Sequence, residues 1–324
     1  MEPLADMLEI ITCAILIFVS IVGNTCLFFS TRRCISGPLQ PSLMIIFSLV
    51  FVHLLKNLVV NIMKIVYSSG GMLDSVSCKI LRFTETLSTQ LAIWFMLHFA
   101  VLYHHKLYQI VHPANETLNL NHQKRHLKAV SILWITGFGI CIPILAFTEK
   151  LQHLNGANDT GLLYTKGLNM DCEIDFGNRQ VEYYYEKIFL VLIDILPLTI
   201  LVFVCFWIVF LLWEQRRLTY GGIWMGDDAS EIEIFRGAKV SILLTLLITS
   251  LWISHFVFIC FLKNLESFPF TPALLTALSS SFSAVSPYVL MLVNYKVKLE
   301  AFCCRKTEKF TTQPTNVLPC PYAS

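Results

Sequence analysis

The side chains with the clearest potential for chemistry lie in an apolar stretch between residues 79 and 103. Five polar residues follow one another there: Arg82, Glu85, Thr86, Thr89 and Gln90. Separations of three and four residues place them on one stripe of a helix. Ionisable groups in an apolar segment require a partner or a function, so this stripe is a candidate site for a small polar or charged ligand. The alternative is a structural pair, in which Arg82 and Glu85 neutralise each other along the helix surface.

No group of residues in the sequence forms a catalytic set. The nine histidines show no metal-ligand spacing with acidic or cysteine partners, and no metalloprotease or phosphate-binding motif is present. We therefore expect neither an enzyme nor a bound metal or cofactor. A net charge of +2 without a long basic run gives no reason to expect nucleic-acid binding.

The elements that position the polar stripe must lie in a membrane. Hydrophobic residues make up 55% of the chain and charged residues only 14%, with a mean hydropathy of +0.64. About 20 apolar residues in a helix cross the hydrocarbon core of roughly 30 Å. We predict an all-α integral membrane protein, a single domain over residues 1–324 with seven transmembrane helices and a tail at 295–324. The expected spans are 8–30, 42–66, 79–103, 127–148, 186–212, 238–262 and 271–294.

Charge placement predicts how this bundle crosses the lipid bilayer. Lys and Arg concentrate in one alternate set of loops, which includes Arg32, Arg33, Arg216 and Arg217, and in the tail. By the positive-inside rule, the N-terminus lies outside and the tail lies in the cytoplasm. We therefore expect a multi-pass protein of the plasma membrane.

Two cysteines and one sequon fall on the predicted outer side. Cys78 and Cys172 are the only two of the 11 cysteines expected to face an oxidising compartment, so we predict a disulfide between them. The bond would tie the long loop 149–185 over the mouth of the bundle. Asn158 begins an Asn-Asp-Thr sequon in the same loop and is the predicted glycan acceptor. Cys303 and Cys304, just beyond the seventh span, are candidates for palmitoylation.

A second polar face runs along the second span. His53, Lys56, Asn57, Asn61 and Lys64 share one side of the helix, which must face the bundle interior. The functional interpretation is a conformational switch network around Asn57. The structural alternative is that these residues satisfy one another and interior water. Single polar residues elsewhere, namely Asp194, His255 and His98, are expected to be internal hydrogen-bonding partners.

Several short motifs resemble those of the rhodopsin-like receptor superfamily and, within it, the vomeronasal type 1 receptors and their fish olfactory class-A-related counterparts. The matching segments are Gly23-Asn24, His53-Leu54-Leu55-Lys56-Asn57 and Ser286-Pro287-Tyr288-Val289-Leu290, together with the cysteine pair. The Asp-Arg-Tyr motif of the superfamily is replaced by Leu102-Tyr103-His104. Bitter taste receptors are the related alternative, because their seventh span ends in a sequence like Asn294-Tyr295-Lys296-Val297-Lys298. Cys78 favours the vomeronasal-like group, since bitter receptors typically lack that cysteine.

The resemblance implies a receptor that couples a pheromone-like or odorant molecule to a heterotrimeric G protein. Family position adds Phe189 and Thr276 to the expected ligand site. Arg216, Arg217, Arg236 and Lys239, at the ends of spans five and six, are the expected G-protein contacts, unless they serve only to set topology. The alternative from another functional class is a transporter or channel whose permeation path is lined by the polar stripes.

Overall fold

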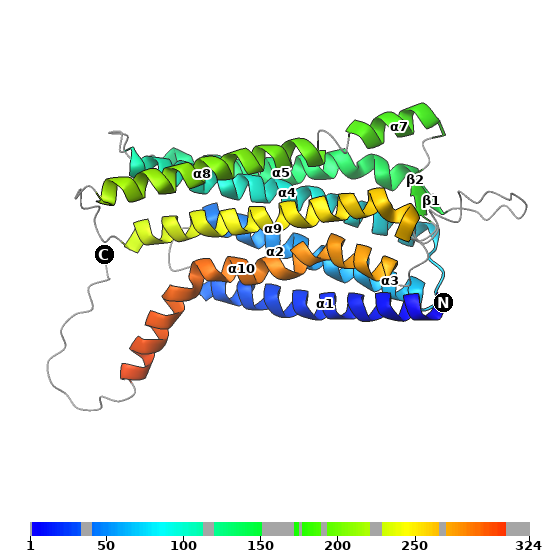
Figure 1. The fold of residues 1–324 in the computed structure, drawn as a ribbon, viewed down its shortest axis with the longest axis horizontal. Helices are drawn as coiled ribbons and strands as arrows, with labels where there is room; N and C mark the ends of the chain where they lie inside the picture. The colour runs from blue at the N-terminus through cyan, green and yellow to red at the C-terminus, as the bar shows by residue number, and fades with distance from the viewer. Residues whose placement is uncertain are drawn as a thin grey trace, which may run out of the picture.

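The computed structural model has seven helices that are long and apolar enough to cross a membrane, packed side by side in one bundle (Figure 1). The prediction of a seven-helix membrane bundle is confirmed. The structure describes residues 2–33, 41–112, 120–150, 172–174, 177–188, 193–220, 229–265 and 270–308.

The spanning elements follow the chain order. They are α1 (Glu2–Arg33), α2 (Pro41–Leu55) with its continuation α3 (Asn61–Ser68), α4 (Ser75–Val111), α5 (Leu120–Phe147), α8 (Leu196–Tyr220), α9 (Ala229–Leu265) and α10 (Thr271–Glu308). A shorter helix, α7 (Arg179–Ile188), precedes α8. Strands β1 (Thr148–Lys150) and β2 (Cys172–Ile174) pair antiparallel at the end where α1 begins (Figure 1).

The second span is one helix interrupted by a wide turn. Between α2 and α3, the segment η1 (Lys56–Val60) has π-helical geometry. Such a turn takes in an extra residue and rotates the side chains that follow it relative to a regular helix. The polar residues of this span are therefore not aligned as an unbroken helical wheel would place them.

Helix α4 is the central helix of the bundle, and this position explains its composition. Of its most apolar stretch 67% is buried, compared with 22% for α5. Leu87, Leu91, Phe95 and Phe99 supply its apolar contacts, each at most 1% exposed. Because protein rather than lipid surrounds α4, polar side chains on it find partners, and α4 tolerates more of them than a lipid-facing helix.

The outer surface of the bundle is apolar. Ile135, Phe203 and Phe206 are each about two-thirds exposed. In water such a surface would promote aggregation, whereas in a bilayer it faces the acyl chains. The exposed residues thus agree with the assignment of these helices as membrane spans.

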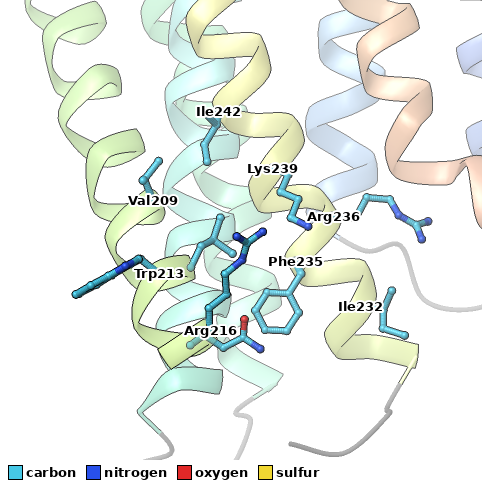
Figure 2. Close-up of a pocket in the computed structure, with 10 residues that line it drawn as sticks. Val209, Trp213, Arg216, Ile232, Phe235, Arg236, Lys239 and Ile242 are labelled. Atoms are coloured by element: carbon cyan, nitrogen blue, oxygen red, sulfur yellow. The ribbon is translucent and has the colours of Figure 1, made fainter. Parts of the chain in front are cut away.

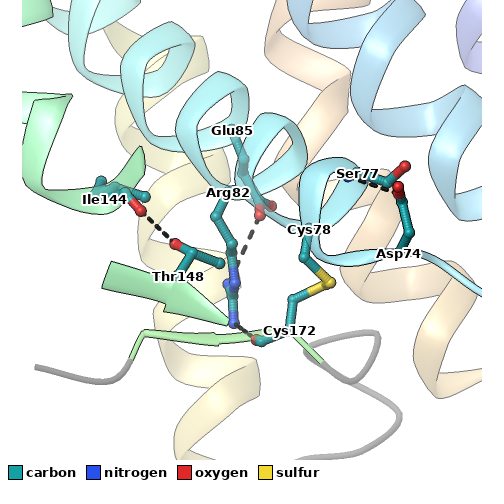
Figure 3. The surroundings of a disulfide bond; sticks show 8 residues. All are labelled: Asp74, Ser77, Cys78, Arg82, Glu85, Ile144, Thr148 and Cys172. Carbon is teal, nitrogen blue, oxygen red and sulfur yellow. Dashed lines mark hydrogen bonds and ion pairs between the residues drawn. A yellow bond between two sulfur atoms is a disulfide. The ribbon is translucent and has the colours of Figure 1, made fainter. Parts of the chain in front are cut away.

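A disulfide joins the start of α4 to the hairpin. Cys78 is bonded to Cys172, with sulfur atoms 2.00 Å apart (Figure 3). Asp74 caps α4 by accepting a hydrogen bond from the Ser77 backbone N–H at 2.9 Å. Arg82, one turn further along, donates to the Cys172 carbonyl oxygen at 3.2 Å. The loop strand is thus held to α4 by a covalent bond and a charged hydrogen bond. We call this end of the bundle the disulfide end.

Helices α4 and α9 approach most closely toward the opposite end. A Cβ atom at Gly237 of α9 would lie 1.9 Å from Cε1 of Tyr103. Tyr103 is 2% exposed, so its ring has little room to move aside. Glycine at this position is what permits the two helices to pack at this distance.

Candidate functional site

A cavity of about 290 Å³ lies within the bundle, between the helices. Its walls come from η1, α4, α9 and α10 and from the turn that precedes α8. The lining residues are Lys56, Glu85, Thr89, Ala92, Ile93, Asp194, Ile248, Leu251, Trp252, His255, Phe256, Leu278, Ser279, Phe282 and Ser283. Four of them are ionisable, which is unusual for the interior of a membrane protein and makes the cavity a candidate functional site. Glu85 lies seven residues beyond Cys78, so the cavity begins about two helical turns inside the disulfide.

Lys56, the first residue of the π-helical turn, lines the cavity. Its ammonium group donates to Thr89 Oγ1 at 3.0 Å, and Thr89 in turn donates to the Glu85 carbonyl oxygen at 2.8 Å. Lys56 is 6% exposed. A buried ammonium requires compensation by negative charge. Glu85 and Asp194 are the carboxylates that interact with it electrostatically.

Asp194 and His255 have unused hydrogen-bonding capacity. Within the described part of the chain, no hydrogen bond joins either side chain to another residue, although both lie in the cavity wall. Lys56 uses one of its three donors on Thr89. The cavity therefore offers an ammonium, a carboxylate and an imidazole to a bound molecule, from three different elements.

Aromatic side chains form the apolar part of the cavity. Trp252 and Phe256, one turn apart on α9, are stacked with an interplanar angle of 2° and centroids 5.8 Å apart. Phe282 of α10 also lines the cavity. A small cavity with aromatic walls and a few convergent polar groups is the usual form of a site for small molecules.

The predicted stripe on α4 divides between several environments. Glu85 and Thr89 line the cavity, whereas Arg82 turns toward the hairpin and lies 3.9 Å from the Glu85 carboxylate (Figure 3). Gln90 is buried against α5, where its side-chain oxygen accepts a hydrogen bond from Cys141 Sγ at 3.3 Å. Thr86 is not among the lining residues. The side chains of this one stripe therefore line the cavity, contact the loop strand and pack against α5.

Thr276 belongs to a different polar cluster. Its hydroxyl donates to Glu9 Oε1 and accepts from Lys64 Nζ, both at 3.0 Å. Ser68 donates to the other Glu9 oxygen at 2.9 Å. These bonds tie α1 to α3 and α10, and Thr276 does not line the cavity. Phe189 lies outside the described residues.

Asn57 takes part in a buried chain of hydrogen bonds. Its side-chain oxygen accepts from Asn61 at 3.0 Å, and the Asn61 oxygen accepts from Ser280 of α10 at 3.2 Å. His53 Nδ1 lies 3.0 Å from Ser286 Oγ, and the His53 ring contacts Phe282 edge-on at 5.5 Å. Because Phe282 also lines the cavity, this network and the cavity share a wall.

The residues expected at a cytoplasmic surface lie together at the end opposite the disulfide. Arg216, Arg236 and Lys239 line a second cavity, of about 720 Å³, between α8 and α9 (Figure 2). The Arg217 guanidinium lies over the Trp213 ring, 5.9 Å from its centroid. Asn158 lies outside the described residues. Cys303 and Cys304 lie in the last part of α10, where the structure describes the helix but not the side chains.

A comparison with protein families decides the class of this bundle. The model of the 7 transmembrane receptor (rhodopsin family) matches residues 23–293. The chain belongs to this family. A comparison with curated proteins finds no significant match.

Rhodopsin-family proteins are G-protein-coupled receptors and not enzymes. This chain is therefore a G-protein-coupled receptor. Membership implies coupling to a G protein and binding of a small ligand within the membrane-embedded bundle. The cavity with ionisable walls near the disulfide end is therefore the candidate ligand site of this receptor.

For Asp194 and His255 the sequence predicts internal hydrogen bonds, and for Lys56 it leaves open a switch network or mutual satisfaction with its neighbours. The structure places all three residues on the cavity wall. The signal that marks them is that each is an ionisable residue in an apolar run. Trp252 and Phe256 carry no such signal, because apolar aromatics occur throughout the spans.

Proposed function

We propose that this receptor is chemosensory and detects a small external molecule in the cavity of about 290 Å³. The observation that carries the proposal is the set of ionisable side chains on the walls of one cavity, namely Lys56, Glu85, Asp194 and His255. A ligand with a cationic group near Asp194 and an acceptor near Lys56 would form hydrogen bonds that these side chains do not make within the protein. The size of the cavity favours a small molecule over a peptide or a folded protein.

The proposed orientation places the disulfide end outside the cell. The concentration of Lys and Arg in the opposite loops and in the tail supports it. In this orientation Asn158 is available for glycosylation, and Cys303 and Cys304 are available for palmitoylation. The mature receptor resides in the plasma membrane. The cue is then pheromone-like or an odorant, in keeping with the vomeronasal-like motifs.

Signalling requires that ligand binding favour one arrangement of α9 over another. Trp252, Phe256 and His255 lie on α9, so a ligand in the cavity contacts the helix whose other end carries Arg236 and Lys239. Phe282 connects the cavity to the network around His53 and Asn57. We propose that Arg216, Arg217, Arg236 and Lys239 contact the heterotrimeric G protein and that Asn57 acts within the switch network.

The test is a response screen with variants of the cavity. The receptor is expressed with a promiscuous G protein and a calcium readout, and a panel of acids, amines and steroids is applied. For an activating compound, Glu85→Gln should reach the cell surface yet shift the dose response, by tenfold for each ~1.4 kcal/mol of lost interaction. Thr86→Val is the matched control on the same helix, because Thr86 does not line the cavity.

Three outcomes would contradict the proposal. An unshifted response in Glu85→Gln and in Asp194→Asn, at normal surface levels, would place the ligand elsewhere. A response confined to bitter compounds would favour the bitter taste subfamily. Ligand flux through reconstituted membranes without any nucleotide exchange on a G protein would indicate a transporter or channel.

A further inference from the structure

The second cavity, at the end opposite the disulfide, is an open groove between two spanning helices. Its volume is about 720 Å³, and it is lined by the last turns of α8 and the first turns of α9 (Figure 2). Trp213 on the α8 side is 58% exposed and Ile232 on the α9 side is 45% exposed. Figure 2 shows Arg216 extending from α8 toward α9, on which Lys239 lies. We call this feature the α8/α9 groove.

The α8/α9 groove straddles the boundary between apolar and polar sequence on both helices. On α8, an apolar run ends at Trp213 and is followed by Glu214, Gln215 and Arg216. On α9, Lys239 is the last charged residue before the apolar run that begins at Val240. Such a change marks the level where hydrocarbon gives way to lipid headgroups, and a tryptophan is typical of that level. The groove therefore has apolar walls on its membrane side and cations at headgroup depth.

Two cations of the α8/α9 groove, Arg216 and Lys239, lack an acidic partner among the described residues. Within the described residues no acidic side chain lines it, and neither Arg216 nor Lys239 forms an ion pair. The neighbouring acidic residues interact elsewhere: Glu214 lies 3.6 Å from His112, and Glu233 interacts electrostatically with Tyr103 and Lys106 of α4. Like charges brought together in one groove repel each other unless an anion binds between them.

We propose that the α8/α9 groove binds the phosphate of an anionic membrane phospholipid. The phosphate lies between Arg216 and Lys239, where guanidinium and ammonium groups donate to its oxygens. An acyl chain runs along Val209 and Ile242, which line the groove on its membrane side. A lipid fills both halves of the groove at once, whereas a free phosphate ion leaves the apolar half unfilled. A protein segment must first displace the lipid that surrounds α8 and α9.

Native mass spectrometry of the purified full-length receptor tests this proposal, because it counts bound lipids without ligand or G protein. The receptor is titrated with phosphatidylglycerol and, separately, with phosphatidylcholine. We expect one phosphatidylglycerol to bind in preference to phosphatidylcholine. Arg216→Gln/Lys239→Gln should weaken this binding by about 30-fold, since two headgroup contacts are lost.

The controls separate this groove from general attraction between basic residues and acidic lipid. Arg125→Gln/Lys128→Gln removes the same charge from exposed positions on α5 at the same end, and should leave the preferred lipid bound. Arg216→Lys/Lys239→Arg keeps both charges and should also retain it. Glycerol 3-phosphate, which carries a phosphate without acyl chains, should not displace the lipid at equal concentration.

Each opposite result overturns the proposal. Equal binding of both lipids, or equal loss in the α5 control, would show that no specific site exists. Displacement by glycerol 3-phosphate as effective as by lipid would assign the groove to soluble phosphates. If Arg216→Gln/Lys239→Gln abolished G-protein activation with lipid binding unchanged, the cations would serve the G protein alone. Lipid binding is measured without ligand, so a failure here leaves the proposed chemosensory function untouched.

Discussion

The two ends of the bundle handle charge in opposite ways. In the cavity near the disulfide, Lys56 is buried with Glu85 and Asp194 as opposite charges, and Glu85 also has Arg82 at 3.9 Å. In the α8/α9 groove, Arg216 and Lys239 share a space without any acidic lining residue in the described chain. One site is nearly balanced, whereas the other carries a positive excess.

The difference follows from how far each site lies from water. An unpaired ion in a low-dielectric interior costs several kcal/mol, so the cavity must carry its own counter-charges to remain folded. At headgroup depth, water and lipid phosphates stabilise the positive charge, so cations there need no acidic partner within the protein. The balanced cavity suits reversible binding of a small polar molecule, and the unbalanced groove suits an anion.

The largest expected effect comes from unbalancing the cavity. Lys56→Met leaves Asp194 without its buried cation, whereas Glu85 keeps Arg82, and the substitution should destabilise the receptor by about 3–5 kcal/mol. Thermal unfolding of the purified protein measures the loss. Lys56→Met/Asp194→Asn should recover part of it, because one uncompensated charge is removed. A single variant as stable as the parent would show that the cavity does not need internal charge balance.

Removing the disulfide tests whether the cavity end depends on its covalent tether. Cys78→Ala/Cys172→Ala opens a loop whose ends are 94 residues apart in sequence, and should cost roughly 2–5 kcal/mol and reduce surface expression. Cys26→Ala, at an exposed free cysteine, is the control. Normal expression and an unchanged dose response in the double variant would mean that the hairpin is held without the bond.

Helix packing toward the opposite end gives the next largest effect. Gly237→Ala brings a Cβ to 1.9 Å from the Tyr103 ring, so α9 must move away from α4 at a cost of about 1–3 kcal/mol. Because this displacement opens the end that faces the proposed G-protein site, basal signalling should rise. The control is Gly139→Ala, where an added Cβ meets nothing within 4 Å. Restoration of normal stability by Tyr103→Leu in the Gly237→Ala background would support the cause, and equal Tm values for both glycine variants would refute it.

The smallest effect is expected for the exposed contact between Glu214 and His112, beside the α8/α9 groove. Glu214→Gln removes the partner of His112, at 3.6 Å, and should change stability by about 0.5 kcal/mol because both side chains are substantially exposed to solvent. The same substitution should not alter lipid binding in the groove. A loss above about 2 kcal/mol would show that this end also relies on internal charge balance.

The sequence determined the architecture of this protein. Seven apolar stretches of sufficient length leave a helix bundle as the only way to satisfy the backbone in lipid, and the structure contains it. Cys78 and Cys172 were paired on topology alone, and they are bonded in the structure.

Only the tertiary structure decided which polar residues meet. A helical stripe is broad, so Arg82, Glu85 and Gln90 were equivalent by spacing, yet they face the hairpin, the cavity and α5. A regular helical period does not predict the π-helical turn that begins at Lys56, nor the hydrogen bond from the Lys56 ammonium to Thr89. Thr276 of α10 likewise donates a hydrogen bond to Glu9 of α1, a residue far away in the sequence. Partners across a bundle depend on helix rotation and depth, which packing sets and the local sequence does not specify.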